Sequence, residues 1–146
     1  MIIYTMGFAQ KNAESFFSLI RNNKIEILID IRLNNKSQFA GFTKGSDLPF
    51  LLKEICNCDY IHKIDYAPTK EILSAFQKGV IDWRGYEERF LPLIEKRKIE
   101  LDFEKSFSNY SNVCLLCTEP TPEMCHRRLV AEYLTKKMVG ATLLHI

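Results

Sequence analysis

Thiols, an imidazole, a guanidinium group and a carboxylate are concentrated in one short part of the chain. Cys117 ends an apolar run, Glu119 follows it, and Cys125, His126 and Arg127 come after a few polar residues. Side chains of these types can supply a nucleophile, a proton-transfer group and an anion-binding group. We therefore expect the chemistry or the binding of this protein to take place here.

A helix is predicted to begin within this stretch. Thr121-Pro122 is typical of a helix start, which predicts a helix over about residues 123–138 and places Cys125 on its first turn. The positive end of a helix favours a thiolate or a bound anion. With His126 and Arg127 adjacent, the pKa of Cys125 is expected to be lowered. Cys125 is then a nucleophile, or part of an anion pocket.

A purely structural role for the same residues is the alternative. Cys125 is small enough to be a buried packing residue, and Arg127 can pair with Glu119 or with Asp30 instead of a ligand. The residue types alone do not decide between these two interpretations.

A second polar constellation, Asp30-Ile31-Arg32, ends an otherwise apolar strand. Asp30 and Arg32 are two residues apart and share one face of the strand. A carboxylate in an apolar strand is costly unless it is paired. If this strand lies beside the one that ends at Cys117, the two constellations converge at one edge of the sheet. Asp30 then joins Glu119 and His126 as a candidate for proton transfer, and Arg32 joins Arg127 as an anion-binding group.

Zinc binding is less well supported than a metal-free site. Cys117, Cys125 and His126 offer three ligands, but their spacing matches no standard zinc module. Side chains of adjacent helical residues also point about 100° apart. Cys114 and Cys117 cannot form a zinc knuckle from one strand, because they face opposite sides of it. We predict no cofactor and no metal.

The elements that position these residues alternate between strands and helices. Apolar or β-branched runs predict strands at about residues 2–6, 25–31, 60–64, 112–117 and 142–146. Helical periodicity predicts helices at about residues 12–21, 48–56, 81–98 and 123–138, and a further helix that opens at residues 67–69. Residues 101–110 are expected to form a helix or a turn. This alternation predicts a single α/β domain over residues 1–146, with a mostly parallel sheet of about five strands between two layers of helices. The first strand, helix and second strand form a βαβ unit, which predicts that these two strands pair in parallel.

Composition limits the class of protein. The 146 residues are 47% hydrophobic and 26% charged with a net charge of +2, which is typical of a globular protein and neither requires nor excludes nucleic-acid binding. No window approaches the about 20 apolar residues of a membrane span, and no signal peptide is evident. Five cysteines are an odd number, so we expect reduced thiols in a cytoplasmic protein. The sequence predicts no oligomeric state.

Several of these motifs together resemble the domain of unknown function 488 family. They are residues 4–7 (Tyr-Thr-Met-Gly), Asp30-Ile31-Arg32, Gln38-Phe39, Tyr60-Ile61-His62, Arg84-Gly85-Tyr86, the pattern Cys117-x-Glu119-x5-Cys125-His126-Arg127, and Leu144-His145-Ile146. The chain departs from the family pattern at Phe8, where the family commonly has histidine. The resemblance covers essentially the whole chain and implies an α/β fold and a functional site, without implying a reaction. Thr5, Gln38, Phe39 and Tyr86, which belong to these motifs, are candidates for substrate binding.

The leading functional prediction is a small cytoplasmic hydrolase or transferase that acts on an anionic, phosphate- or nucleotide-bearing substrate. Cys117 or Cys125 is its expected nucleophile. The alternative is a non-catalytic module that binds a nucleotide or a nucleic acid, on which Phe39, Phe42, Trp83 and Tyr86 are possible stacking surfaces. A third possibility is a polar cluster that only holds strand ends together.

Overall fold

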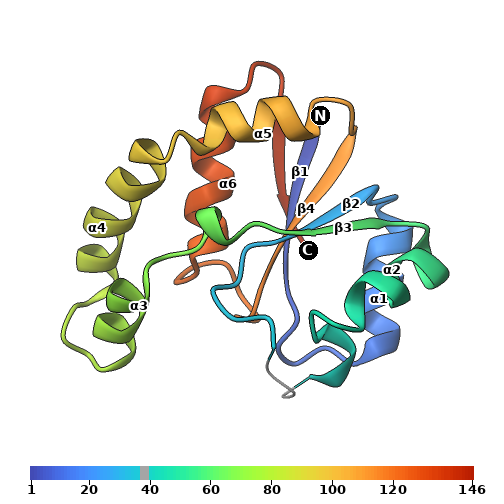
Figure 1. Cartoon of the computed structure of the whole chain (residues 1–146), viewed down its shortest axis with the longest axis horizontal. Helices are drawn as coiled ribbons and strands as arrows, with labels where there is room; N and C mark the ends of the chain where they lie inside the picture. The colour runs from blue at the N-terminus through green and yellow to red at the C-terminus, as the bar shows by residue number, and fades with distance from the viewer. Residues whose placement is uncertain (37–39) are drawn as a thin grey trace.

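The protein folds as one α/β domain built on a five-stranded sheet (Figure 1). The computed structural model describes residues 1–36 and 40–146. The strands are β1 (Ile2–Gly7), β2 (Ile27–Asp30), β3 (Asp59–His62), β4 (Asn112–Cys117) and β5 (Thr142–His145). They lie in the order β3-β2-β4-β1-β5, and every neighbouring pair is parallel. The predicted fold class is therefore confirmed.

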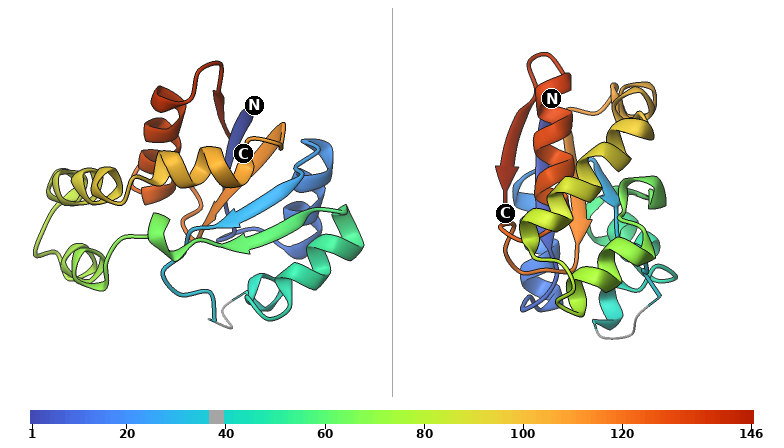
Figure 2. Two further views of the ribbon diagram at one scale, coloured as in Figure 1. Left: turned by 45° about the horizontal axis from the view of Figure 1, so that its top comes forward. Right: turned by 90° about the vertical axis from the view of Figure 1, so that its left-hand side faces the viewer.

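Helices cover both faces of the sheet. They are α1 (Ala13–Asn22), α2 (Leu48–Cys56), α3 (Lys70–Gln77), α4 (Trp83–Lys96), α5 (Ile99–Phe107) and α6 (His126–Lys137), with short 3-10 turns at Gly41–Thr43 and Ile64–Tyr66. The apolar residues of α1 and α2 form the core on one face, and those of α4, α5 and α6 form the core on the other. Figure 2 shows α3 and the start of α4 standing out to one side of the sheet. No helix of the described residues is both long and apolar enough to cross a membrane.

Strand β4 lies between β1 and β2, so the predicted pairing of the first two strands is wrong. β1 and β2 are parallel members of one sheet, but each forms its hydrogen bonds with β4. All of residues 113–117 are buried, and these side chains contribute to the cores on both faces, which suits β4 to the centre of the sheet. Consecutive strands are adjacent in only about two-thirds of cases, and here the crossover from β1 to β2 passes over one strand position.

This strand order creates a crevice between the carboxyl ends of β2 and β4. The chain that leaves β2 continues to α2 on one face of the sheet, whereas the chain that leaves β4 continues to α6 on the other. Open α/β sheets bind ligands at such a switch point, because the two loops diverge and leave a hollow between them. Both polar constellations of the sequence follow these two strands.

Candidate functional site

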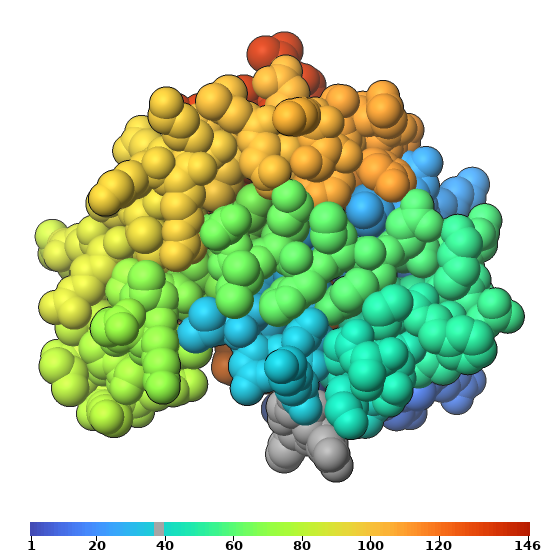
Figure 3. Space-filling view, in the orientation of Figure 1, coloured from blue at the N-terminus to red at the C-terminus, as the bar shows by residue number. Residues whose placement is uncertain are grey.

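A cavity of about 370 Å³ opens at this switch point. Figure 3 shows a notch in the surface there, between the α3–α4 arm and the loop that follows β2. The cavity is lined by Arg32, Leu33 and Asn34 after β2, by Cys117, Thr118 and Glu119 at the end of β4, by Met124, Cys125 and His126 before and at the start of α6, and by Pro68, Leu73, Phe76, Gln77, Trp83 and Tyr86 from the α3–α4 side. The cavity therefore brings together Cys117, Glu119, Cys125, His126 and Tyr86 of the predicted site.

Cys117 lines the cavity in a setting that stabilises a thiolate. A hydrogen bond from the Cys125 thiol is the main cause that lowers the pKa of Cys117 below its ordinary value. Backbone N–H groups of Thr118 and Glu119 and the charge of Arg127 act in the same direction, while burial opposes them. The other four cysteines have raised pKa values, chiefly through burial or, for Cys125, through this hydrogen bond. Cys117 is thus the thiol that ionises first.

Cys125 does not have the environment predicted for it. Helix α6 begins at His126, so Cys125 occupies its N-cap with an extended backbone (φ −133°, ψ 135°), and neither the predicted Thr121 cap nor a helical turn before Cys125 forms. The pKa of Cys125 is raised, because its thiol donates to Cys117 and because it is buried. The expectation of a lowered pKa at Cys125 is wrong. Cys117 carries the negative charge, and the Cys125 thiol stays protonated beside it.

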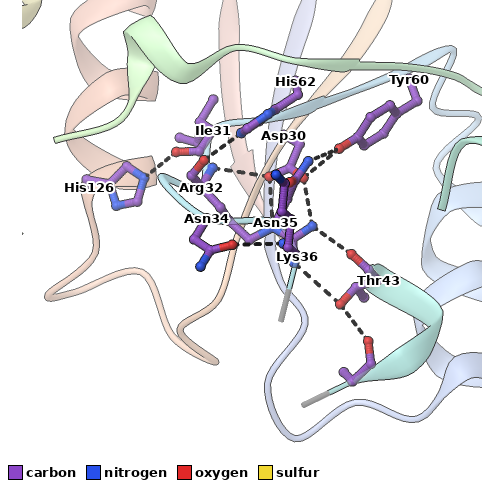
Figure 4. Close-up of polar contacts among 11 residues, drawn as sticks. Asp30, Ile31, Arg32, Asn34, Asn35, Lys36, Thr43, Tyr60, His62 and His126 are labelled. Carbon is purple, nitrogen blue, oxygen red and sulfur yellow. Dashed lines mark hydrogen bonds and ion pairs between the residues drawn. The ribbon is translucent and has the colours of Figure 1, made fainter. Parts of the chain in front are cut away.

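His126 is held by the main chain of the neighbouring strand. Its Nε2 lies 2.9 Å from the carbonyl oxygen of Ile31, an acceptor, so in the neutral ring Nε2 carries the proton and Nδ1 is left as an acceptor (Figure 4). Cys117 Sγ is 3.6 Å from Nδ1 and 3.7 Å from Nε2. A sulfur almost equidistant from both nitrogens lies over the face of the ring rather than on the axis of either N–H bond or lone pair. The Nδ1 lone pair is therefore not used by Cys117.

Cys117, Cys125 and His126 are also the candidate metal ligands. Ligand atoms of Cys117, Cys125 and His126 all lie within 4.8 Å of one another, and all three residues are buried. Two thiolates and an imidazole suit zinc, with the cavity supplying a fourth position. The sulfur of Cys117 does not lie near the axis of the Nδ1 lone pair, however, so a shared ion requires a side-chain rotation. The cluster can hold a metal only after rearrangement.

Arg127 is a buried cation that no carboxylate neutralises. The side chain is 1% exposed, and no described carboxylate lies within 4.0 Å of its nitrogens. Its terminal nitrogens donate to the backbone carbonyls of Glu119 and Pro120, and its Nε has no partner among the described residues. Neither of the two predicted ion pairs of Arg127 forms. The guanidinium instead holds the loop after β4 and lowers the pKa of Cys117.

Asp30 and Arg32 form a separate cluster on the opposite face of the sheet. Asp30 is fully buried and accepts from Arg32 Nε at 2.8 Å and from Arg32 Nη2 at 2.7 Å. The Tyr60 hydroxyl donates to Asp30 at 2.8 Å, and Arg32 Nη2 also donates to the Thr43 carbonyl oxygen at 2.7 Å. Figure 4 shows this group gathered apart from His126.

The predicted convergence of the two constellations is therefore only partly realised. β2 and β4 are neighbours, with Asp30 paired to Leu116, but that register puts the side chains of Asp30 and Cys117 on opposite faces of the sheet. The Arg32 guanidinium, which was predicted to hold an anion, donates its hydrogen bonds to Asp30 and Thr43 instead. Asp30, nominated for proton transfer, is enclosed by its partners and does not line the cavity.

The remaining predicted residues lie in different places. The Glu119 side chain is exposed at the cavity, and Tyr86 lines it. Thr5 is fully buried on β1, where its hydroxyl lies 2.6 Å from His145 Nδ1, and it does not line the cavity. Gln38 and Phe39 lie outside the described residues.

Sequence analysis missed the wall of the cavity that comes from α3. Leu73 and Phe76 lie on this short helix, and Met124 precedes α6. Apolar residues on a short amphipathic helix are normally assigned to the core, so no sequence signal distinguishes them as cavity residues. Tyr60 and Thr43 were missed for a similar reason, because their partners, Asp30 and Arg32, are distant in the sequence.

Comparison with known proteins identifies one relationship. The family model described as "Domain of unknown function DUF488" matches residues 12–134, which include both polar clusters and the aromatic wall of the cavity. Neither the curated proteins nor the solved structures that were searched contain a match.

Proposed function

The chain belongs to the DUF488 family, whose description states no activity, and we propose that it is a thiol-dependent hydrolase or transferase with Cys117 as the nucleophile. One observation carries the proposal. Cys117 lies at the carboxyl end of a central strand, lines an open cavity, and has its sulfur within 4.8 Å of ligand atoms of Cys125 and His126, in surroundings that lower its pKa. Donors arranged around a sulfur favour its anionic form, which is the nucleophilic one.

The buried charge of Arg127 supports the same assignment. Burying a cation without a counter-charge is costly. A thiolate at Cys117 supplies negative charge nearby, and the influence of Arg127 on the pKa of Cys117 follows from this attraction. Arg127 is a positioning residue, because it acts through Cys117 and through the loop that it holds.

The proposed reaction has two steps. The Cys117 sulfur forms a bond to the transferred group while the bond between that group and its leaving group breaks, and the leaving group takes a proton from solvent. Water or another acceptor then attacks the transferred group, gives its proton to Nδ1 of His126, and releases the Cys117 thiolate. His126 returns this proton to solvent, which restores the neutral ring. The reaction requires Cys117 to stay reduced, which supports a cytoplasmic location.

An anionic, phosphate- or nucleotide-bearing substrate stays a prediction with less support. The two guanidinium groups nominated to hold the anion, those of Arg32 and Arg127, have partners within the protein. Backbone amides beside Cys117 are the donors left for negative charge. A non-catalytic nucleotide-binding module is the second candidate, favoured by the stacked rings of Trp83 and Tyr86 in the cavity wall.

Alkylation by iodoacetamide over a range of pH, followed for each cysteine by mass spectrometry of its peptide, tests the proposal. Cys117 is expected to react well below the unperturbed thiol pKa of about 8.5. Cys58 and Cys114, which are buried and have raised pKa values, serve as internal controls. Arg127→Met is expected to move the Cys117 profile to higher pH.

Two outcomes would overturn the proposal. If Cys117 in the folded protein titrates at or above the ordinary thiol pKa, it is not an activated nucleophile, and the binding module becomes the better hypothesis. If Cys117 reacts only after zinc chelation, the cluster of Cys117, Cys125 and His126 is a metal site.

A further inference from the structure

Three aromatic side chains build the cavity wall that faces the sheet. Trp83 and Tyr86 are stacked, with ring centroids 4.8 Å apart and an interplanar angle of 15°. Phe76 meets both rings edge-on, at 5.6 Å and 5.4 Å. Leu73 and Met124, whose side chain is 61% exposed, extend this apolar surface. Walls of this kind bind apolar parts of ligands, because they remove apolar surface from water.

The cavity offers no free cation. Among the described residues that line it, only Arg32 and Glu119 are ionic, apart from the thiols and His126. The charge of Arg32 is matched by Asp30 at 2.7 Å. The Glu119 carboxylate is exposed and forms no ion pair with a described residue. An anionic substrate group in the cavity would therefore meet negative charge without a free positive partner.

The hydroxyl of Tyr86 is a polar group on a residue that lines the cavity. The side chain is 2% exposed, and its Oη forms no hydrogen bond with a described residue. The only fully enclosed side-chain polar atom without a partner among the described residues is Arg127 Nε, so Tyr86 Oη is not sealed in the core and reaches the cavity. Its pKa is raised, mainly by burial and further by nearby Cys117 and Cys125. The Tyr86 hydroxyl thus stays protonated, and Tyr86 lines the same cavity as Cys117 and Cys125.

Building on the proposed function, we propose that the cavity binds an uncharged, largely apolar substrate group that carries a hydrogen-bond acceptor. The apolar body lies against Phe76, Trp83 and Leu73. The acceptor, such as a carbonyl oxygen, receives the hydrogen bond of Tyr86 Oη, which orients the adjacent electrophilic atom toward Cys117 Sγ. A buried hydroxyl that finds its only partner in the ligand selects for ligands that supply the acceptor.

Three alkylating probes of graded character test the substrate class on the intact protein. Iodoacetate is anionic, iodoacetamide is small and neutral, and N-benzyl-iodoacetamide is neutral with an apolar ring. The rate of Cys117 modification by each is divided by its rate with N-acetylcysteine amide, which removes differences in intrinsic reactivity. We expect the normalised rate of the benzyl probe to exceed that of iodoacetamide about tenfold. Complete burial of an aromatic ring would give a larger factor, but the open cavity buries the ring only in part. Iodoacetate is expected to be the slowest.

Variants assign the preference to the proposed contacts. Tyr86→Phe keeps the ring and removes the hydroxyl, so it should slow the benzyl probe roughly three- to tenfold, the effect of one hydrogen bond. Phe76→Ala should reduce the advantage of the benzyl probe over iodoacetamide. Phe50→Ala is the matched control, because Phe50 is an aromatic residue of α2 that is 66% exposed and outside the cavity, and it should leave all three rates unchanged.

The outcomes separate this inference from the proposed function. If Cys117 reacts as an activated thiolate but iodoacetate is as fast as the benzyl probe after normalisation, the substrate class is wrong and the nucleophile stands. If no probe modifies Cys117 faster than the model thiol at pH 7, the proposed function itself fails. The comparison of probes on the unmodified protein gives this answer even where a variant does not fold.

Discussion

Replacement of Asp30 by asparagine is expected to destabilise the fold by about 3–5 kcal/mol, the usual cost of removing one partner from a buried ion pair. The carboxylate is fully buried, and the Arg32 side chain that it holds is 4% exposed. The variant leaves the guanidinium buried without a counter-charge, and the new amide cannot accept both of its hydrogen bonds. Because domains of this size have a total stability of about 5–15 kcal/mol, the loss is a large fraction of the whole.

A double variant tests the physical reason for that loss. Asp30→Leu combined with Arg32→Met removes both charges, so no buried ion is left unpaired. Replacing a whole buried pair with apolar residues is often neutral. The double variant is therefore expected to be more stable than Asp30→Asn, although Tyr60 and Thr43 lose a partner in it.

Urea unfolding followed by circular dichroism measures these differences, and alkylation of Cys117 measures the site. We expect Asp30→Asn to lower the unfolding midpoint and, where it remains folded, to keep the reactivity of Cys117, because the two clusters lie on opposite faces of the sheet. An Asp30→Asn protein with the wild-type midpoint but an inactive Cys117 would refute the structural role given to Asp30 and return it to the chemistry.

Three further predictions concern stability. Tyr60→Phe removes a hydroxyl that donates to a buried carboxylate at 2.8 Å, and urea unfolding should show a loss of about 2 kcal/mol; an unchanged midpoint would show that this bond adds no net stability. Gly7→Ala would drive a Cβ into the Glu119 carbonyl oxygen and should lower the melting temperature sharply, whereas Gly41→Ala, with no atom within 4 Å, should not; equal effects would contradict the close approach of β1 to the loop. The pKa of Cys117 is lower in the folded than in the unfolded state, so its contribution to stability is present above the unfolded value of about 9 and is lost as pH falls through the folded value. The stability advantage of wild type over Cys117→Ser should therefore grow from pH 6 to pH 9, and a constant difference would exclude a lowered pKa.

The sequence alone determined the elements of the fold and the region of the chemistry. Helical and strand periodicity are local properties, so the alternation of elements, and with it the layered α/β class, could be predicted from neighbours in the chain. The same holds for the side chains at the ends of β2 and β4, because the carboxyl ends of parallel strands meet at one edge of a sheet. Cys117, Cys125 and His126 were assigned to one site on these grounds, and the structure places them around one cavity.

Only the tertiary structure decided what each of these side chains does. The order of the strands places β4 beside β2, and the register of that pair puts the side chains of Asp30 and Cys117 on opposite faces, which separates an ion pair from a thiol site. Which ring nitrogen of His126 carries the proton depends on a carbonyl oxygen 95 residues away in the chain. Ionisation and hydrogen bonding depend on distance through space, so which thiol is lowered in pKa, and which partners hold Arg32 and Arg127, follows from contacts that no local pattern contains.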